Sequence, residues 1–418
     1  MPERKRPFRV GVFLYRHCRP LSRLYSLSKQ GFPFMPPSRN STPMRRLRSH
    51  ARRNAHVHHP TLLRWFERAI MTLAWPVGAL IETIYALRVI PGHPKSVRDF
   101  FSSGFRMLEA ALCENVPLFE YTAFKLYEPA RRILAKDYLY STECNIFRLL
   151  NDRCGADNEE VQDKFRFAEI CRQWGFPCIP TLAVYANGSQ IFPDSPFLPH
   201  QPSLWVKDLR GSKGSGAGQW ILQEGLYVSP EGHKKLPKEL AESWLHRSCI
   251  VQPLLRNHAA LDPVSDGNLA VIRIVSGIDT KGCVHLITHD ISLPWGGFAN
   301  RARSLIGKLD ASGKIIGSFD HLGNSVPRHP ETGALISDIT VPYWQKAQEL
   351  VKKAHRTAFS RFVFLGWDLA ITAEGPVLIE TNSGPGFFHH QLIDGIPLGH
   401  TAFSEIACSY LFEEKKCA

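Results

Sequence analysis

Residues 366–383 read GWDLAITAEGPVLIETNS and restrict the possible folds of this chain more than any other stretch. Two apolar runs flank a short turn centred on Glu374, which predicts a β-hairpin. Such a turn places Asp368 opposite Glu380, and Asn382 follows two residues later on the same face. Two carboxylates and an amide oxygen suit Mg²⁺ better than Zn²⁺. A surface hairpin with solvated acids is the alternative, which the apolar neighbours disfavour.

A lysine and a glycine-rich loop form a second candidate site. The apolar strand Leu204–Asp208 carries Lys207 near its end, and the loop 211–218 follows, with four glycines. Glycine leaves backbone N–H groups free to approach phosphate oxygens, and lysines add positive charge. A flexible hairpin would look similar, and the loop does not match the GxxxxGK[ST] phosphate-binding motif. The candidate phosphate-binding residues of the loop are Gly211, Ser212, Lys213, Gly214 and Gly216.

Three further positions are weaker candidates when each is taken alone. Lys164 stands where a helix opens, and a solvated helix residue is the simpler interpretation. Gln252 and Leu254 end an apolar strand and begin irregular chain. Arg273 lies within the apolar strand of residues 268–275, where it would pair with a structural acid or reach a phosphate or carboxylate.

The positive charge of the chain is concentrated at its beginning. Residues 1–59 hold 14 of the 51 Lys and Arg residues and a single acid, Glu3, while the formal net charge of the whole chain is +13. The remaining residues are therefore balanced, which argues against a nucleic-acid-binding fold. Prolines among arginines and serines predict a disordered tail, although the composition also resembles a transit peptide.

Residues 60–150 have the pattern of helices, and Leu62–Ile90 is the most apolar part. The uncharged centre, residues 69–81, is shorter than the roughly 20 residues that span a bilayer. Pro76 would also kink a helix there. A buried core helix is one interpretation, and a helix lying in the plane of a membrane beside a basic tail is the other.

The remainder of the chain predicts an α+β body of more than one lobe. A helix is expected over Asn158–Trp174 and another over Val341–Phe359, with a strand over Cys178–Tyr185 between them. Short apolar strands with Gly and Pro turns fill the region between residues 200 and 290. The ten cysteines include no CxxC pair, which excludes zinc-ribbon and thioredoxin-like sites and favours reduced thiols in a cytoplasmic protein.

The order of these motifs resembles the ATP-grasp superfamily, most closely its sugar-transfer-associated branch, over roughly residues 110–412. The resemblance implies an ATP-grasp fold, in which two α+β lobes hold ATP, preceded by a helical region and a disordered basic tail. The expected division is a tail at 1–59, a helical region at 60–150 and the ATP-grasp domain at 151–412. Within that domain the small lobe covers about 200–255 and the large lobe about 256–412.

The resemblance also implies roles for the candidate residues. Lys164 and Lys207 look like the phosphate-contacting lysines, and Gly211–Gly218 like the mobile lid over the phosphates. Gln252 and Leu254 look like the hinge that meets adenine, where the family commonly carries Glu at the first position. Arg273 and Lys207 correspond to the residues that act in catalysis, with Arg273 on the γ-phosphate or an acyl phosphate. The implied Mg²⁺ ligands are Asp368, Glu380 and Asn382.

The implied activity is an ATP- and Mg²⁺-dependent carboxylate–amine ligase that works through an acyl phosphate in cell-surface glycan modification. Mn²⁺ could replace Mg²⁺. The substrates would be small or glycan-linked carboxylates and amines, with no nucleic acid. Residues 1–90 are expected to touch an anionic membrane from the cytoplasmic side. The alternatives are a phosphotransferase acting on a sugar or lipid hydroxyl and a non-catalytic, membrane-apposed ATP-binding protein.

Overall fold

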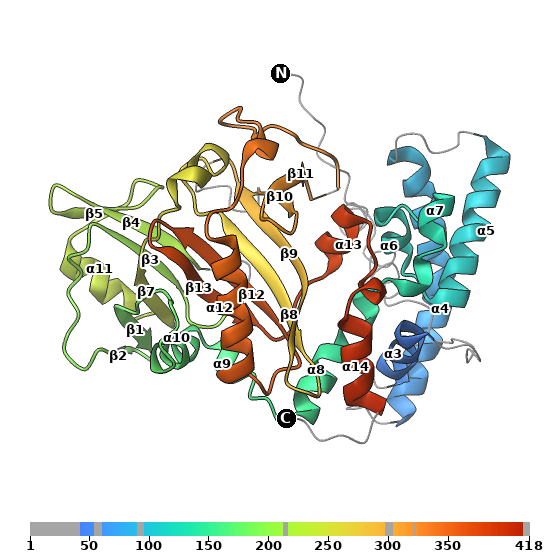
Figure 1. Ribbon diagram of the computed structural model, residues 1–418, viewed down its shortest axis with the longest axis horizontal. Helices are drawn as coiled ribbons and strands as arrows, with labels where there is room; N and C mark the ends of the chain where they lie inside the picture. The colour runs from blue at the N-terminus through green and yellow to red at the C-terminus, as the bar shows by residue number, and fades with distance from the viewer. Residues whose placement is uncertain are drawn as a thin grey trace. The chain divides into compact units, whose positions relative to one another are not determined.

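The computed structural model of the chain describes residues 42–53, 61–89, 96–211, 216–296, 304–321 and 323–412. The chain divides into two compact units, which are described separately. Unit 1 contains Met1–Ile146 and Asp394–Cys408, and unit 2 contains Phe147–Ile393 and Ser409–Ala418. Figure 1 shows the elements of both units along the chain.

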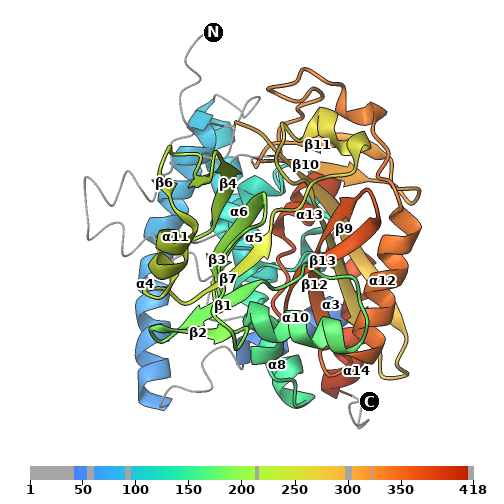
Figure 2. The same cartoon turned by 90° about the vertical axis from the view of Figure 1, so that its left-hand side faces the viewer.

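Unit 1 is helical, as expected for residues 60–150. Its larger helices include α4, which runs through Pro76 without interruption and is drawn at full length in Figure 2. No helix within the described ranges is long and apolar enough to cross a bilayer. Within the described residues, the α-helices that begin in this unit are α3 (Pro43–Arg53), α4 (Thr61–Val89), α5 (Val97–Glu114), α6 (Leu118–Ala123), α7 (Pro129–Arg132), α8 (Asn145–Arg153) and α14 (Phe403–Phe412).

Helix α3 corrects the predicted extent of the tail, because it lies inside residues 1–59 and is folded. Arg48 is buried, its Nε lies 2.5 Å from Glu143 Oε1, and its Nη2 donates to the Tyr138 carbonyl at 2.7 Å. Its Nη1 lies 3.2 Å from Glu114 Oε2. Part of the basic charge is thus internal, where paired carboxylates offset the cost of burying the arginine. The rest of the predicted tail, residues 1–41 and 54–59, lies outside the described residues.

The first sheet of unit 2 has seven antiparallel strands. One face packs on α11 (Pro237–Trp244) through a core that includes Leu204, Val206 and Trp244. The sheet begins before residue 200, so the predicted small-lobe range omits its first two strands. In spatial order the strands are β2 (Ser189–Phe192), β1 (Ala183–Ala186), β7 (Cys249–Pro253), β3 (Ser203–Asp208), β4 (Gly218–Gln223), β5 (Leu226–Val228) and β6 (Lys234–Lys235).

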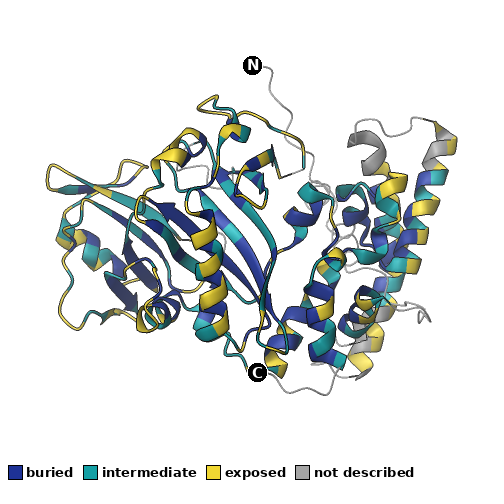
Figure 3. Cartoon of the chain, in the orientation of Figure 1, coloured by how far each residue is buried: buried dark blue, intermediate teal, exposed yellow. Residues whose placement is uncertain are grey.

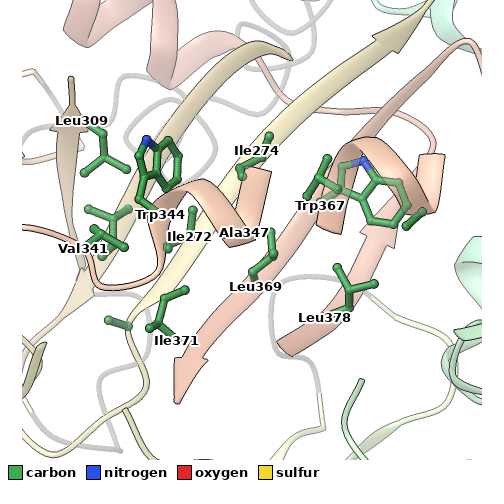
Figure 4. Packing of buried hydrophobic residues seen from close by; sticks show 14 of the residues in the cluster. Ile272, Ile274, Leu309, Val341, Trp344, Ala347, Trp367, Leu369, Ile371 and Leu378 are labelled. Atoms are coloured by element: carbon green, nitrogen blue, oxygen red, sulfur yellow. The ribbon is translucent and has the colours of Figure 1, made fainter. Parts of the chain in front are cut away.

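The second sheet has six antiparallel strands. One face is covered by α12 (Trp344–Thr357), whose Trp344, Ala347 and Val351 enter the larger hydrophobic core. Figure 4 shows Trp344 and Ala347 beside Ile272, Ile274 and Leu369 of the sheet. In spatial order the strands are β11 (Ile315–Phe319), β10 (Ser304–Leu309), β9 (Val284–Pro294), β8 (Val271–Ile278), β12 (Phe364–Thr372) and β13 (Gly375–Asn382).

Two predicted elements of unit 2 have different bounds in the structure. The helix expected over Asn158–Trp174 is two helices, α9 (Glu159–Gln162) and α10 (Lys164–Gln173). They are separated because Asp163 takes an extended conformation and caps α10, accepting from the N–H groups of the second and third residues after it. The strand expected over Cys178–Tyr185 begins only at Ala183, since two prolines precede it.

The cysteines are mostly free thiols, as expected. Seven of those in the described part of the chain are free, whereas Cys154 is disulfide-bonded, which the sequence did not predict. The other elements in the described residues are α13 (Phe388–Asp394) and the 3₁₀ turns Ala135–Asp137, Ser141–Glu143, Ala259–Val264, Ile336–Asp338 and Leu398–His400.

Candidate functional site

A cavity of about 1120 Å³ lies in unit 2 and is lined by residues of both sheets. On β3, Leu204 and Val206 point to the core beneath α11, so the alternating residues Ser203, Trp205 and Lys207 face the cavity. On the second sheet, the opposite face to the α12 core supplies the other wall. The residues of that wall include Val271, Ser292, Asp368, Ile379 and Glu380.

Two lysines from different elements meet in this cavity. Lys164 opens α10, where the Asp163 cap fixes the helix start, and its Nζ donates to the Gly211 carbonyl at 2.9 Å. The buried Lys207 Nζ lies 3.7 Å from Glu380 Oε2. Burial lowers the pKa of Lys207, the Glu380 carboxylate raises it in part, and Lys164 lowers it further. Two neighbouring cations in a partly desolvated cavity favour an anionic ligand.

The hairpin of β12 and β13 has the predicted pairing of Asp368 with Glu380, and Asn382 lies opposite Gly366. The turn itself differs from the prediction. Thr372 pairs with Gly375, so only two residues form the turn, and a β-bulge after Asp368 then restores the predicted pair. Ile379 is the residue that the bulge adds, and both it and Glu380 line the cavity.

Asp368 is held by Arg273 on the neighbouring strand. Arg273 Nε donates to Asp368 Oδ1 at 2.5 Å and Nη2 donates to Oδ2 at 2.9 Å. Burial raises the pKa of Asp368 to about 6, although the guanidinium lowers it and Glu380 raises it again. The structure thus realises the structural-acid pairing that the sequence left open for Arg273.

This ion pair belongs to a row of charges across five strands. Glu380 lies opposite Asp368, Asp368 opposite Arg273, Arg273 opposite Asp290, and Asp290 opposite Lys308. All share one face of the second sheet, because directly opposed residues point the same way. The row lies on the cavity side, since Asp368 and Glu380 line the cavity.

A histidine adds to this row at Asp290. The Nε2 of the buried His390, on α13, lies 3.0 Å from Asp290 Oδ2. The sequence interpretation expected residues 290–303 to line the acceptor site but assigned Asp290 no role, left His390 open between substrate contact and local packing, and missed Lys308. An acid in the alternating strand His289–Pro294 was the available signal.

The predicted hinge residues lie at the end of β7. Gln252 is opposite Trp205, so it faces the cavity side of the first sheet, and it is buried. Its Oε1 has no hydrogen-bond partner within the described part of the chain. Leu254 lines the cavity. A buried acceptor without a donor fits a ligand that brings an amino group.

The glycine loop is described only at its two ends. Gly211 lines the cavity, while Ser212, Lys213 and Gly214 lie outside the described residues. At the other end, Gly216 has a φ of +63°. Arg247 donates there to the Gly216 carbonyl and, at 2.7 Å, to Asp208 Oδ1. This tether, which the sequence did not indicate, ties the end of the loop to the end of β3.

The donor set of the hairpin fits a hard cation. Asp368, Glu380 and Asn382 share the cavity face, because the pairs of β12 and β13 alternate regularly beyond the bulge. The described residues contain no group of three or more His, Cys, Asp and Glu placed to hold a metal. The set has two carboxylates and one amide, which is the oxygen chemistry that Mg²⁺ prefers and that soft metals do not.

Residues 143–404 match the model of a family described as sugar-transfer associated ATP-grasp. No curated protein matches the chain. Among solved structures, it is similar to a carboxyaminoimidazole ribonucleotide synthase from Aspergillus clavatus complexed with ATP, with 15% identity over 60% of this chain and 52% of that one, at a TM-score of 0.35. It is also similar to D-alanine–D-alanine ligase from Helicobacter pylori, with 12% identity over 60% and 58% and a TM-score of 0.35. The chain spans about half the length of the first solved structures that it matches.

Proposed function

The chain belongs to the sugar-transfer-associated ATP-grasp family, and from this premise we propose that it is an ATP- and Mg²⁺-dependent ligase that joins a carboxylate to an amine. One observation carries the proposal. Helix α10 and the two sheets bring Lys164, Lys207, Asp368 and Glu380 to the wall of one cavity, with cations on one side and oxygen ligands on the other. A nucleoside triphosphate with its cation requires this combination of charges.

We assign the nucleotide to the side of the cavity that the first sheet forms. Lys164 and Lys207 would hold phosphate oxygens, and the loop Gly211–Gly218 would cover them with backbone N–H groups. Gln252 Oε1, which is buried without a donor, would accept from the adenine amino group, and Leu254 would meet the same ring. These roles suit Lys164 and Lys207 because they are cationic, and Gln252 because its buried Oε1 has no donor within the described residues.

Asp368, Glu380 and Asn382 would hold Mg²⁺, with Mn²⁺ as a substitute. The cation supplies charge neutralisation on the transferring phosphoryl group. Asp368 is bonded to Arg273 in the structure, so the arginine must release at least part of that carboxylate. Asp290, on the other side of Arg273, would act as a positioning residue that keeps the guanidinium beside the reaction centre.

The proposed reaction has two displacements. A carboxylate oxygen of the first substrate attacks the γ-phosphorus, the bond to the β-phosphate oxygen breaks, and ADP leaves. The amine of the second substrate then attacks the acyl carbon, and phosphate leaves with the electron pair of the broken C–O bond. The proton lost by the amine passes to solvent or phosphate. Arg273 would hold the charge that grows on the phosphoryl and acyl oxygens.

We further propose glycan-linked or sugar-related substrates for this ligase and a cytoplasmic location. The name of the family supports the first point, because it associates these proteins with sugar transfer. The mostly free thiols support the second, since reduced cysteines are typical of that compartment.

The test is Glu380→Gln, with Glu374→Gln as the matched control in the turn of the same hairpin. Mg²⁺–ATP turnover is measured as phosphate release with amino acids, uronic acids and amino sugars, and products are analysed by mass spectrometry. We expect an amide product, near-complete loss of turnover in Glu380→Gln, and an unchanged rate in the control. Equal rates in the two variants would refute the metal assignment. A stable phosphoester would establish a phosphotransferase instead, and ATP binding with no turnover would establish a sensor.

A further inference from the structure

Helix α4 of unit 1 exposes a continuous apolar stripe. Leu62, Phe66, Ala69, Leu73, Leu80 and Ile84 follow one another at steps of three, four or seven residues, and no charged residue stands at those positions. Leu62 is 86% exposed, Leu73 77% and Phe66 65%. Spacing of this kind puts the side chains on one side of a helix. We refer to these six residues as the α4 stripe.

The opposite side of α4 is already used for packing. Met71, Ala74, Trp75 and Gly78 are buried, so they account for the contacts of this helix with its own unit. The α4 stripe is therefore a second apolar face. A helix that is apolar on all sides is normally buried, and exposed apolar patches on soluble proteins mark interaction sites. Figure 3 shows exposed residues along the neighbouring helix α5, where Phe101 and Phe105 are each 69% exposed.

The dimensions of the α4 stripe fit a surface that lies along the helix. From Leu62 to Ile84 it extends over roughly 33 Å at the rise of an α-helix. None of the described helices satisfies the length and hydropathy needed to cross a bilayer. The other side of α4 remains packed against protein. These features suit a helix that lies in the interface plane with one face among the acyl chains.

Charge complementarity indicates what kind of surface the α4 stripe would contact. Residues 1–41, which precede α3 and α4 in the chain, contain nine Lys and Arg residues and only one acid, Glu3. Arg98, on α5, is exposed one turn before the exposed Phe101. Trp65, exposed beside the α4 stripe, is the residue type that favours the headgroup level. An apolar helix face with basic residues beside it binds anionic lipid through burial of its apolar surface and through electrostatic attraction to the headgroups.

We propose that the α4 stripe is a docking surface for an anionic phospholipid bilayer, on which α4 lies parallel to the membrane plane. Residues 1–41 add electrostatic attraction to the lipid headgroups. This inference does not depend on the proposed ligase activity, because the ligase residues belong to unit 2. Its consequence is that the enzyme works at a membrane surface rather than free in solution.

The test is flotation of the full chain with vesicles of phosphatidylcholine that contain a minority of phosphatidylglycerol, compared with phosphatidylcholine alone. We expect binding to the anionic vesicles that weakens as salt is raised. Leu73→Glu combined with Leu80→Glu should lower the partition coefficient between vesicles and water at least about tenfold. The reason is that two leucines that would be buried in the lipid are lost. Ile316→Glu, on β11 of unit 2, is the control: Ile316 is 52% exposed, close to the 55% of Leu80, and this variant should bind as the unaltered chain does.

Two further measurements distinguish a membrane from other possible occupants of the α4 stripe. Sedimentation equilibrium without lipid should show a monomer, whereas a dimer that the double variant dissociates would overturn the proposal in favour of self-association. Deletion of residues 1–41 should weaken vesicle binding. Stronger binding after this deletion would mean that the segment competes with lipid for the stripe, and it would overturn the role proposed for residues 1–41. Unchanged circular dichroism of each variant establishes that loss of binding is not loss of folding.

Discussion

Arg273 and Asp368 form an ion pair with two hydrogen bonds in the candidate site. The arginine makes two bonds to the carboxylate, while burial raises the pKa of that carboxyl to about 6. A cation bound at Asp368 and the guanidinium of Arg273 therefore compete for the same oxygens. In the proposed reaction, Arg273 would be released to contact the phosphoryl and acyl oxygens only when a cation occupies the metal site at Asp368.

Replacing Arg273 by lysine should affect the chemical step more than nucleotide binding. A lysine keeps the charge but cannot form the two-pronged contact. We expect kcat to fall by about a hundredfold, because an oxyanion-stabilising donor is lost in the transition state. KM for ATP should stay within about threefold. Steady-state kinetics check this, with the exposed Arg361→Lys as the control, and a rise in KM without a change in kcat would contradict the role.

His355 shows how a residue outside the site supports the second sheet. It is fully buried on α12, its Nδ1 lies 2.7 Å from Ser276 Oγ, and its Nε2 lies 2.8 Å from the Phe362 carbonyl. A carbonyl only accepts, so Nε2 carries the hydrogen and Nδ1 accepts from the serine. Ser276 Oγ accepts in turn from Trp367 Nε1 at 2.8 Å. The chain of bonds joins α12, β8 and β12.

The stability of unit 2 should fall in acid because of His355. Burial lowers its pKa from 6.5 to about 4, so the unfolded chain binds the proton first as the pH falls. The contribution of the neutral His355 to the free energy of unfolding is complete above pH 6.5. It falls by ~3 kcal/mol as the pH is lowered to 4. His355→Gln should be less stable at neutral pH and should lose this pH dependence. Urea unfolding at several pH values measures it, with the half-exposed His285→Gln as the control, and parallel pH profiles would contradict the assignment.

At the scale of elements, the hairpin was readable from the sequence because acids interrupt apolar strands at positions symmetric about a turn. The bulge was not readable, since Ile379 resembles any other strand residue. The predicted pair was correct because two errors cancelled. The prediction assumed a turn one residue longer than the observed turn, and it assumed a ladder without a bulge. Without the bulge, Ile379 would stand opposite Asp368 and Glu380 would point to the other face.

The row of charges through Asp290 and Lys308 shows what local patterns cannot supply. Each residue occurs in an ordinary alternating strand, so its own strand predicts only a polar side chain. The row exists because β9 lies between β8 and β10 in a particular register. That order is a property of strand pairing far apart in the chain, so one strand alone does not reveal it.

The end of the glycine loop should be sensitive to a single methyl group. A Cβ at Gly216 would lie 2.2 Å from Asp208 Oδ1, and the residue has a positive φ of +63°. Gly216→Ala should break the Arg247 tether and raise the dissociation constant for ATP several-fold, whereas Gly225→Ala has a similar φ but open space around the Cβ. That control should cost only about 1 kcal/mol of stability. Titration calorimetry with ATP compares the two, and equal affinities would exclude a role for the tethered loop.

At the scale of the whole molecule, the formal charge of +13 has two parts with different physical roles. Arg45 and Arg48 of α3 are paired with Glu114, and Arg48 also reaches the buried Glu143. This charge belongs to the core of unit 1. The excess in residues 1–41 is the charge that the proposed membrane contact would use. Composition alone could not separate the two, because arginine-rich sequence looks the same in both.

Truncation separates these roles, since residue 59 is not the boundary of a dispensable tail. Deleting residues 1–41 should leave the melting temperature of the chain unchanged. Deleting residues 1–59 removes α3, exposes the surface that Met44 and Leu47 cover, and leaves Glu143 buried without its cation. Loss of one partner of a buried ion pair costs about 3–5 kcal/mol, so the melting temperature of unit 1 should fall by several degrees or more.

The matched point variant is Arg48→Ala, which should reproduce a large part of the longer deletion's effect because it removes the same buried cation. Differential scanning calorimetry of the three proteins resolves the transition of unit 1 from that of unit 2 if the units unfold separately. ATP affinity should remain the same in all three, since the proposed nucleotide residues belong to unit 2. Equal melting temperatures for the two deletions would mean that α3 adds nothing to unit 1, and the charge of residues 42–59 would then be available to the membrane as well.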